Sequence, residues 1–288
     1  MPQITIFTPT YNRAYIIDKL YLSLCNQTCS DFEWLIVDDG STDNTEDLIS
    51  KYIAENKIKI RYRKQPNGGK HRAINYGLNL AEGELFFIVD SDDHLSEDAV
   101  EWITKTAESI RDDENFAGLS GIRVTPSGEK IGGGLDFGII DSDAINIRLK
   151  HHISGDLAEV YKTKILRQYP FPTFDKEKFC PEALVWNRIA QKYSLRYCHK
   201  GIYICEYLPD GLTAKITNLR RKSPKASMTY YSEFAHTDIP FAQKVKANIN
   251  FWRFKLSEYQ PHYRMISLLG ILTYIPGTIY KYLDSKKL

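Results

Sequence analysis

Apolar runs alternate with amphipathic segments along roughly the first 112 residues. Short apolar runs bounded by polar residues are typical of buried strands, whereas apolar residues three and four positions apart are typical of helices. We expect the helices to be capped by Asn12 and by Ser41 or Thr42, with a third helix after the breaker at residues 66–69. This order predicts an α/β fold, a parallel sheet with helices on both faces. The predicted strands are residues 4–7, 32–37, 58–62 and 84–89.

The alternation ends after about residue 112, and the remaining chain has a different pattern. From this change and from a later one in the tail we divide the chain into three parts, at residues 1–112, 113–220 and 221–288. The middle part predicts strands at residues 116–124 and 195–205, a hairpin turn at 126–128 and a helix at 182–193.

The last part of the chain is rich in aromatic residues and lysine. No charged side chain occurs between Arg264 and Lys281, but this apolar stretch is shorter than the ~20 residues of a spanning helix and contains Pro276. Tyrosines and lysines flank it, which suits a helix that lies in a membrane interface. A helix packed on its own domain or on a second copy of the chain in a homodimer fits the same pattern, so both alternatives stay open.

The composition is that of a globular protein, with 43% hydrophobic and 26% charged residues. The formal net charge of +2 gives no reason to expect a nucleic acid partner. The five cysteines are odd in number and lack zinc-ligand spacing, so we expect reduced thiols. The N-terminus has no basic segment followed by an apolar core, so we expect no secretory signal. We predict a cytoplasmic protein, and the tail adds the alternative of a peripheral position on the inner face of the plasma membrane.

Three carboxylates follow the fourth predicted strand within four positions, at Asp90, Asp92 and Asp93. Ligands of open α/β sheets bind at the carboxyl ends of strands, and carboxylates crowded there repel one another unless a positive charge lies between them. A hard divalent cation bound through oxygen atoms is the natural ligand. The pattern therefore predicts a metal site.

Other polar segments are expected at the same edge of the sheet. Because this edge collects the carboxyl ends of parallel strands, a nucleotide could bind there. Lys70 lies in a glycine-rich turn that opens a helix, a position suited to phosphate, and Arg72 is a second cationic candidate. His71 either touches the same ligand or is an ordinary surface histidine. The segments are residues 8–13 after the first strand, 37–43 after the second, and 67–75 at the start of the third helix.

Together with the acidic segment, these pieces resemble in their order the family 2 glycosyltransferases, which are inverting enzymes of the GT-A fold. The likeness covers residues 1–110 strongly and residues 150–213 more weakly. It implies a Rossmann-like, mostly parallel central sheet with helices on both faces and a helical C-terminal tail. It also implies that residues 1–112 form the nucleotide-sugar-binding half of the GT-A domain and residues 113–220 its acceptor-binding half.

The resemblance implies a role for individual residues of the donor site. An aspartate after the second strand, here Asp39, would accept a hydrogen bond from the uracil ring of a UDP-sugar. Asp90 would face the ribose. Asp92 would bind Mn²⁺ or Mg²⁺ between the two phosphates, with Asp93 as its rival for the metal. The other donor-binding residues implied are Thr8, Pro9 and Tyr11, which would line the nucleobase pocket, and Arg13, Lys70 and Ser91.

The family usually supplies its catalytic base from a Glu-Asp pair shortly before an arginine, at the start of a helix. Glu182 lies six residues before Arg188 and takes the place of the second acid, whereas Pro181 replaces the first. Glu182 would then accept the proton of the acceptor hydroxyl group, or else it only stabilises the positive end of its own helix. Asp156, which precedes a strand-like run, would orient the acceptor.

Many relatives carry a further metal-binding histidine after the late strand. This chain has no histidine at the comparable place. Either Glu206 substitutes for it, or the metal is held mainly by Asp92 and the diphosphate.

We therefore predict a metal-dependent inverting glycosyltransferase. It would move a sugar from a UDP-sugar to a hydroxyl group of a glycan, free or lipid-linked, in surface polysaccharide synthesis. A nucleotidyltransferase is the alternative enzyme, but that class usually carries a glycine-rich loop after the first strand, and residues 8–13 contain no glycine. A non-catalytic sugar-nucleotide-binding protein is the third alternative, which the carboxylates at both the donor and the base position disfavour.

Overall fold

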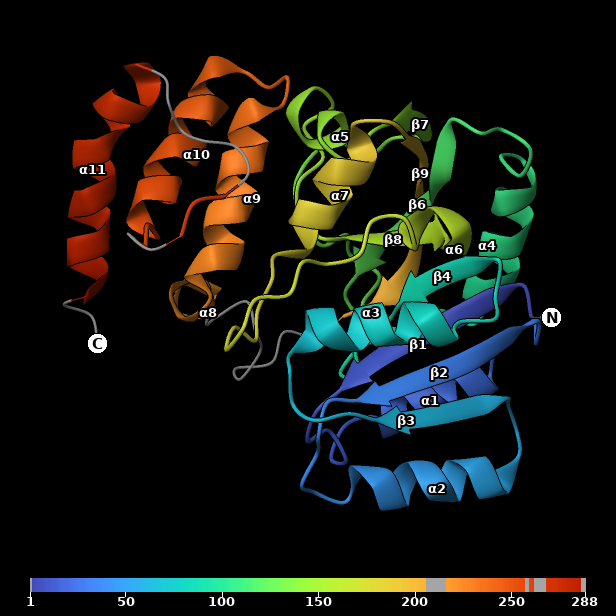
Figure 1. Ribbon diagram of the computed structural model, residues 1–288. Helices are drawn as coiled ribbons and strands as arrows, with labels where there is room; N and C mark the ends of the chain where they lie inside the picture. The colour runs from blue at the N-terminus through green and yellow to red at the C-terminus, as the bar shows by residue number, and fades with distance from the viewer. Residues whose placement is uncertain (1, 206–215, 257–258, 262–267, 286–288) are drawn as a thin grey trace. The chain divides into compact units, whose positions relative to one another are not determined.

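Strands and helices alternate in the first part of the chain as the sequence pattern predicts (Figure 1). The structure, a computed structural model, describes residues 2–205, 216–256, 259–261 and 268–285. The alternating elements are β1 (Ile4–Thr10), α1 (Asp18–Cys25), β2 (Phe32–Asp38), α2 (Thr45–Glu55), β3 (Ile60–Lys64), α3 (Lys70–Leu80) and β4 (Leu85–Ile88).

The following part adds strands of mixed direction and short helices. Its two long strands agree closely with the predicted strands at residues 116–124 and 195–205. The elements are β5 (His94–Leu95), α4 (Ala99–Glu108), β6 (Phe116–Val124), β7 (Ile139–Ser142), α5 (Asn146–Leu149), β8 (Leu157–Lys162), α6 (Thr163–Leu166) and β9 (Ser194–Ile204).

The nine strands found in the described residues form one sheet in the order β3-β2-β1-β4-β8-β6-β9-β5, with β7 paired to β9. β3, β2, β1 and β4 are parallel, which confirms the prediction for the first half. β8 runs antiparallel to both β4 and β6, and β9 runs parallel to β6. The carboxyl ends of β1, β2, β4, β6 and β9 therefore lie at one edge of the sheet, and β8 begins at that edge.

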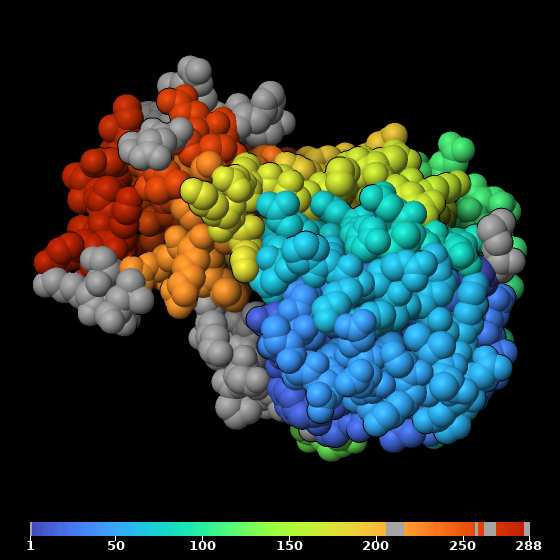
Figure 2. Space-filling view, turned by 60° about the horizontal axis from the view of Figure 1, so that its bottom comes forward, coloured from blue at the N-terminus to red at the C-terminus, as the bar shows by residue number. Residues whose placement is uncertain are grey.

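Helices cover the central strands on both faces because apolar side chains alternate between those faces. Ile4, Ile6 and Trp34 form one buried cluster with apolar side chains of α1, α2 and α4. Phe7 faces α3 on the other side, where a Cβ atom added to Gly77 would lie 2.1 Å from the Phe7 ring. The residues of this first half, drawn in blue to cyan, gather on one continuous surface in Figure 2.

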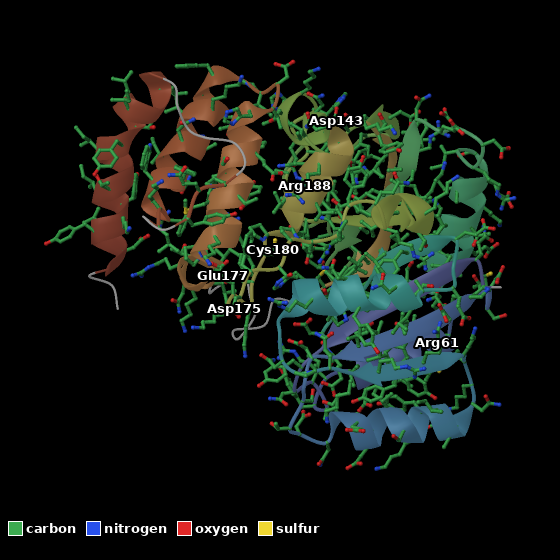
Figure 3. All side chains as sticks on the ribbon, in the orientation of Figure 1. Arg61, Asp143, Asp175, Glu177, Cys180 and Arg188 are labelled. Carbon is green, nitrogen blue, oxygen red and sulfur yellow. The ribbon has the colours of Figure 1, made fainter. Side chains whose placement is uncertain are left out.

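A buried charge is balanced near the amino ends of β1 and β2, away from the polar edge. The Glu33 side chain is fully buried. Its Oε1 accepts a hydrogen bond from the Thr5 hydroxyl group at 2.7 Å, and its Oε2 lies 2.8 Å from Nη1 of Arg61 (labelled in Figure 3). Because the Glu33 carboxylate is fully engaged within the sheet, we assign it a structural role.

Two helix starts differ from the prediction. Asn12 does not cap the first helix: its φ of 53° is left-handed, and α1 begins only at Asp18. The Asn12 Oδ1 instead accepts the main-chain N–H of Thr42 at 2.8 Å, which ties the segment after β1 to the segment after β2. The second helix begins at Thr45, later than the predicted caps.

The chain divides into two compact units. The first, Met1–Pro170 with Lys192–Leu208, contains the whole sheet. The second, Phe171–Gln191 with Pro209–Leu288, is helical. Within it, α10 packs against both α9 and α11. Its helices are α7 (Glu182–Ala190), α8 (Ile216–Lys222), α9 (Pro224–His236), α10 (Phe241–Arg253) and α11 (Leu268–Ser285).

Charged side chains fix α7 and α9 to each other within the second unit. The guanidinium group of Arg188 binds both carboxylate oxygens of Glu233, at 2.8 and 2.7 Å. The Glu177 carboxylate accepts the main-chain N–H groups of Lys225 and Ala226, which satisfies two donors in the first turn of α9. Figure 3 labels Arg188 and Glu177 in this unit.

One face of α11 exposes large apolar side chains. No helix among the described residues is long and apolar enough to cross a membrane. Residues 265–267, the first part of the predicted apolar stretch, lie outside the described residues. The exposed side chains on α11 are Ile271, Leu272, Tyr274, Ile275, Ile279, Tyr280, Tyr282 and Leu283.

Candidate active site

The acidic segment leaves β4 at the polar edge of the sheet. Nζ of Lys70, the first residue of α3, lies 2.6 Å from Oδ1 of Asp90. The main-chain N–H of Asp90 donates to the Tyr203 hydroxyl group at 2.8 Å. Burial raises the pKa of Asp90, but the positive charges of Lys70 and Arg123 outweigh burial and hold that pKa below its usual value. Asp90 is therefore a paired carboxylate.

Asp92 and Asp93 carry charge that the neighbouring cations balance less completely. Burial and the charge of Asp90 raise the pKa of Asp92. The same two causes raise the pKa of Asp93 to about 7, although Arg123, with Nη1 3.8 Å from Oδ2 of Asp93, opposes the rise. Asp93 is buried, whereas Asp92 is partly exposed. Of the two, Asp92 is the more accessible to a ligand.

Sequence reasoning missed Arg123 and Tyr203, which come from the ends of β6 and β9. The Arg123 guanidinium lies 4.2 Å from the centre of the Tyr203 ring, and its Nε donates to the Leu157 carbonyl oxygen at 3.1 Å. Both side chains contact the acidic segment because their strands run in the same direction as β4. Each of the two residues lies near the end of a predicted strand, which could have indicated a place at the edge of the sheet. The sequence did not show in which direction those strands run, so the edge could not be chosen.

The end of β2 is joined to the turn that opens α3. Oδ1 of Asp39 accepts the N–H of Gly68 at 2.8 Å and an amide N–H of Gln65 at 2.7 Å, and its Oδ2 accepts the N–H of Gly69 at 2.7 Å. Asp39 is only 5% exposed. The preceding Asp38 faces other groups: it caps its own turn by accepting the N–H of Ser41 at 2.7 Å.

The end of β1 and the segment after it present only some of their side chains to solvent. Thr8 is buried, and its hydroxyl oxygen accepts the indole N–H of Trp34 at 2.9 Å. Pro9 is partly exposed and Tyr11 is exposed. The charge of Arg13 lowers the pKa of Asp92 against the effect of burial, so Arg13 acts on the acidic segment.

His71 belongs to the interior of the first unit. Its side chain is 3% exposed, so the interpretation as a surface histidine is wrong. Burial, together with the charge of Arg72, lowers the pKa of His71 to about 4. Its imidazole is therefore neutral near pH 7. Arg72 folds back over the turn, where a Cβ atom added to Gly68 would lie 2.5 Å from Cδ of Arg72.

Two further predicted residues have defined positions. Asp156 is exposed, immediately precedes β8, and acts on the pKa of Arg123 through its charge. It therefore lies at the polar edge of the sheet. Glu182 is partly exposed and is the first residue of α7 in the second unit. Glu206 lies outside the described residues, as does any ligand it would provide.

The donor set of the acidic segment is compatible with a divalent cation. Among the described residues, no three side chains of Asp, Glu, His or Cys converge into a ready-made metal cage. The pKa values of Asp92 and Asp93 are nevertheless raised by burial and by the charge of Asp90, so a cation would relieve the crowding of negative charge. Mg²⁺ typically binds one or two carboxylates together with substrate phosphates. The residues present fit that pattern.

The mostly parallel sheet with its polar carboxyl edge fits the GT-A class of α/β folds, and comparisons with known proteins support that class. Residues 5–136 match the model of glycosyl transferase family 2, so this part of the chain is similar to that family. Chondroitin synthase of Pasteurella multocida is 41% identical over 105 residues, 36% of this chain and 11% of the synthase. The GalNAc(5)-diNAcBac-PP-undecaprenol beta-1,3-glucosyltransferase of Campylobacter jejuni is 29% identical over 216 residues, 71% of this chain and 64% of that enzyme.

A solved structure extends the likeness of the fold to most of the chain. The crystal structure of S. aureus TarS 1–349 in complex with UDP-GlcNAc superposes with a TM-score of 0.66 and 20% identity, and the match covers 96% of this chain and 79% of that one. This chain spans less than two thirds of the length of the two sequence relatives named above. The predicted GT-A fold is confirmed.

Proposed function

We propose that this protein transfers a sugar from a UDP-sugar to a hydroxyl group of a glycan acceptor in surface polysaccharide synthesis. The observation that carries the proposal is the convergence of Asp39, Lys70, Asp90 and Asp92 at the carboxyl edge of the parallel sheet. This is where nucleotides bind in open α/β folds. The UDP-GlcNAc bound to the related TarS fold supports a UDP-sugar as the donor.

The donor would lie along this edge with its diphosphate at the start of α3. The positive end of the helix and the Lys70 ammonium group both favour phosphate there. Asp92, with Asp93 as the second candidate, would hold Mn²⁺ or Mg²⁺, which as a Lewis acid stabilises the negative charge of the departing diphosphate. Asp90 would bind the ribose hydroxyl groups, and Tyr11 with Pro9 would border the nucleobase.

Inversion requires one base to take the proton of the acceptor hydroxyl group while that oxygen attacks the sugar carbon. We assign this proton to the carboxylate of Glu182. Its place as the first residue of α7, six residues before Arg188, supports the assignment. Arg188 is held by Glu233, so the helix that presents Glu182 is fixed within its unit. Asp156 would orient the acceptor.

Donor hydrolysis and transfer test this proposal. Purified protein with Mn²⁺ and a panel of UDP-sugars should release UDP slowly. Glu182→Gln should abolish transfer and leave the affinity for UDP near that of the unmodified protein. Asp238→Asn, which changes an exposed acid of the same unit, is the matched control and should keep both properties. If the protein neither binds any sugar nucleotide nor releases UDP from one, the proposed glycosyltransferase activity is refuted. Release of diphosphate from a nucleoside triphosphate would favour a nucleotidyltransferase.

We also propose that α11 lies on the inner face of the plasma membrane, where lipid-linked acceptors are found. Its exposed isoleucines and tyrosines, with Lys281 among them, suit a membrane interface. The undecaprenol in the name of the Campylobacter relative agrees with a lipid-linked acceptor. Replacing Ile275 and Ile279 by Gln should reduce co-sedimentation with anionic vesicles, whereas Ile53→Gln, an exposed isoleucine on α2, should not. Unchanged vesicle binding with a loss of dimers in light scattering would assign the face to a homodimer instead.

A further inference from the structure

The turn before α3 is held in place by one carboxylate. Asp39 accepts the main-chain N–H groups of Gly68 and Gly69, one on each oxygen, at 2.8 and 2.7 Å. Nδ2 of Asn67 donates to the Asp39 carbonyl oxygen at 2.9 Å. Asp39 is buried, so its carboxylate has little water to replace these donors. The conformation of the turn therefore depends on Asp39.

The same turn determines where Lys70 begins. Gly69 has a φ of 95°, in the left-handed region, and directly precedes Lys70 at the first position of α3. From there the Lys70 ammonium group reaches Asp90, 2.6 Å away. Asp39 directly follows β2 and Asp90 follows β4, and β1 lies between these two strands. The turn and Lys70 thus connect Asp39 to Asp90 by polar contacts across the carboxyl end of β1.

We propose that Asp39 is a positioning residue for the diphosphate end of the donor site, because it fixes through Gly68 and Gly69 the turn from which Lys70 extends. The inference rests on the proposed binding of a UDP-sugar. A carboxylate offers about four acceptor positions, so three donors from the turn and from Gln65 leave one for a nucleobase. Asp39 would then couple the two ends of the donor site.

Uridine and UDP distinguish this coupling from recognition of the base alone, since they differ only in the diphosphate. In Asp39→Asn, an amide N–H faces one of the two glycine N–H groups, so the turn loses at least one charge-assisted bond. We expect the affinity for UDP to fall roughly tenfold more than the affinity for uridine, as measured by calorimetry. Equal losses for the two ligands would overturn the inference.

A double-mutant cycle tests whether the effect passes through Lys70. If it does, Asp39→Asn should lower the affinity for UDP much less in a protein that already carries Lys70→Ala than in the unmodified protein. Equal effects of Asp39→Asn in the two proteins would overturn the coupling. Gly69→Ala strains the turn but leaves the Asp39 carboxylate unchanged. It should therefore also lower the affinity for UDP more than the affinity for uridine. It provides a second route if Asp39→Asn fails to fold, and an unchanged ratio in it would count against the inference.

Asp38→Asn is the matched control, because Asp38 is also buried, at the last position of β2, but its carboxylate binds Ser41 and Tyr62. It should leave the ratio of UDP to uridine affinity unchanged, and a change as large as that of Asp39→Asn would overturn the specific role of Asp39. If the unmodified protein binds neither ligand, the proposed function fails together with the inference. If it binds both and only the ratio is insensitive to Asp39, the inference alone fails.

Discussion

Acid should destabilise the folded protein through His71. The side chain is buried in α3, and its pKa is lowered from 6.5 to about 4, first by burial and then by Arg72. In the unfolded chain the imidazole takes up a proton near pH 6.5, whereas in the folded protein it does so only near pH 4. Between these values the unfolded state binds more protons, so the free energy of unfolding falls as the pH is lowered.

The size of the effect follows from the two pKa values. Above pH 6.5 the histidine is neutral in both states and adds no pH dependence. At pH 5 it is mostly charged when unfolded and mostly neutral when folded, which lowers the free energy of unfolding by about 2 kcal/mol relative to pH 7. The effect is complete below pH 4, where both states are protonated.

Urea denaturation at several pH values measures this difference. His71→Phe keeps an aromatic ring in the same site and removes the proton, so the variant should lose about 2 kcal/mol less than the unmodified protein between pH 7 and pH 5. Other groups titrate alike in the two proteins and cancel in the comparison. Between pH 8 and pH 7 the two curves should run parallel. Equal losses at pH 5 would mean that His71 is accessible to protons in the folded state.

Three other substitutions have definite expected outcomes. Gly77→Ala places a Cβ atom 2.1 Å from the Phe7 ring and should lower the free energy of unfolding by about 1–3 kcal/mol in urea denaturation, and a neutral result would contradict the close packing of α3 on β1. Lys162→Met leaves three main-chain carbonyl groups after α4 without their ammonium donor and should lower the free energy of unfolding by about 1–3 kcal/mol in the same assay, and an unchanged value would contradict a structural role of Lys162. Asp92→Asn should weaken Mn²⁺ binding in the presence of UDP, measured by electron paramagnetic resonance, and unchanged Mn²⁺ affinity would remove Asp92 from the metal site.

The parallel half of the sheet could be predicted because its signals are local. Residues 4–7 and 32–37 are short apolar runs followed by polar turns, and such runs form buried strands. The third strand was predicted at residues 58–62, but β3 spans Ile60–Lys64. It is the edge strand of the sheet, and because charged side chains alternate along it and follow its apolar residues, a search for apolar runs placed its bounds two residues too early.

The remainder of the candidate site depends on pairing between distant segments. The positions of Arg123 and Tyr203 beside the acidic segment follow from the directions of β6 and β9, which are fixed by contacts with β8 and with each other. No local pattern encodes those directions. The burial of His71 was likewise missed, because it depends on how α3 packs and not on the polar residues beside it in the sequence.

Because β8 runs antiparallel to β4 and β6, the loop before it reaches the same edge of the sheet as the donor segments. Sequence changes in that loop and in the donor segments have different consequences. The donor segments hold one another through hydrogen bonds, such as those from Gly68 and Gly69 to Asp39, so a change in one segment disturbs the others. The loop that ends at Asp156 reaches the edge from the start of a strand, and Asp156 itself is exposed. Insertions or exchanges in that loop can therefore accumulate during evolution while the hydrogen bonds among the donor segments stay intact.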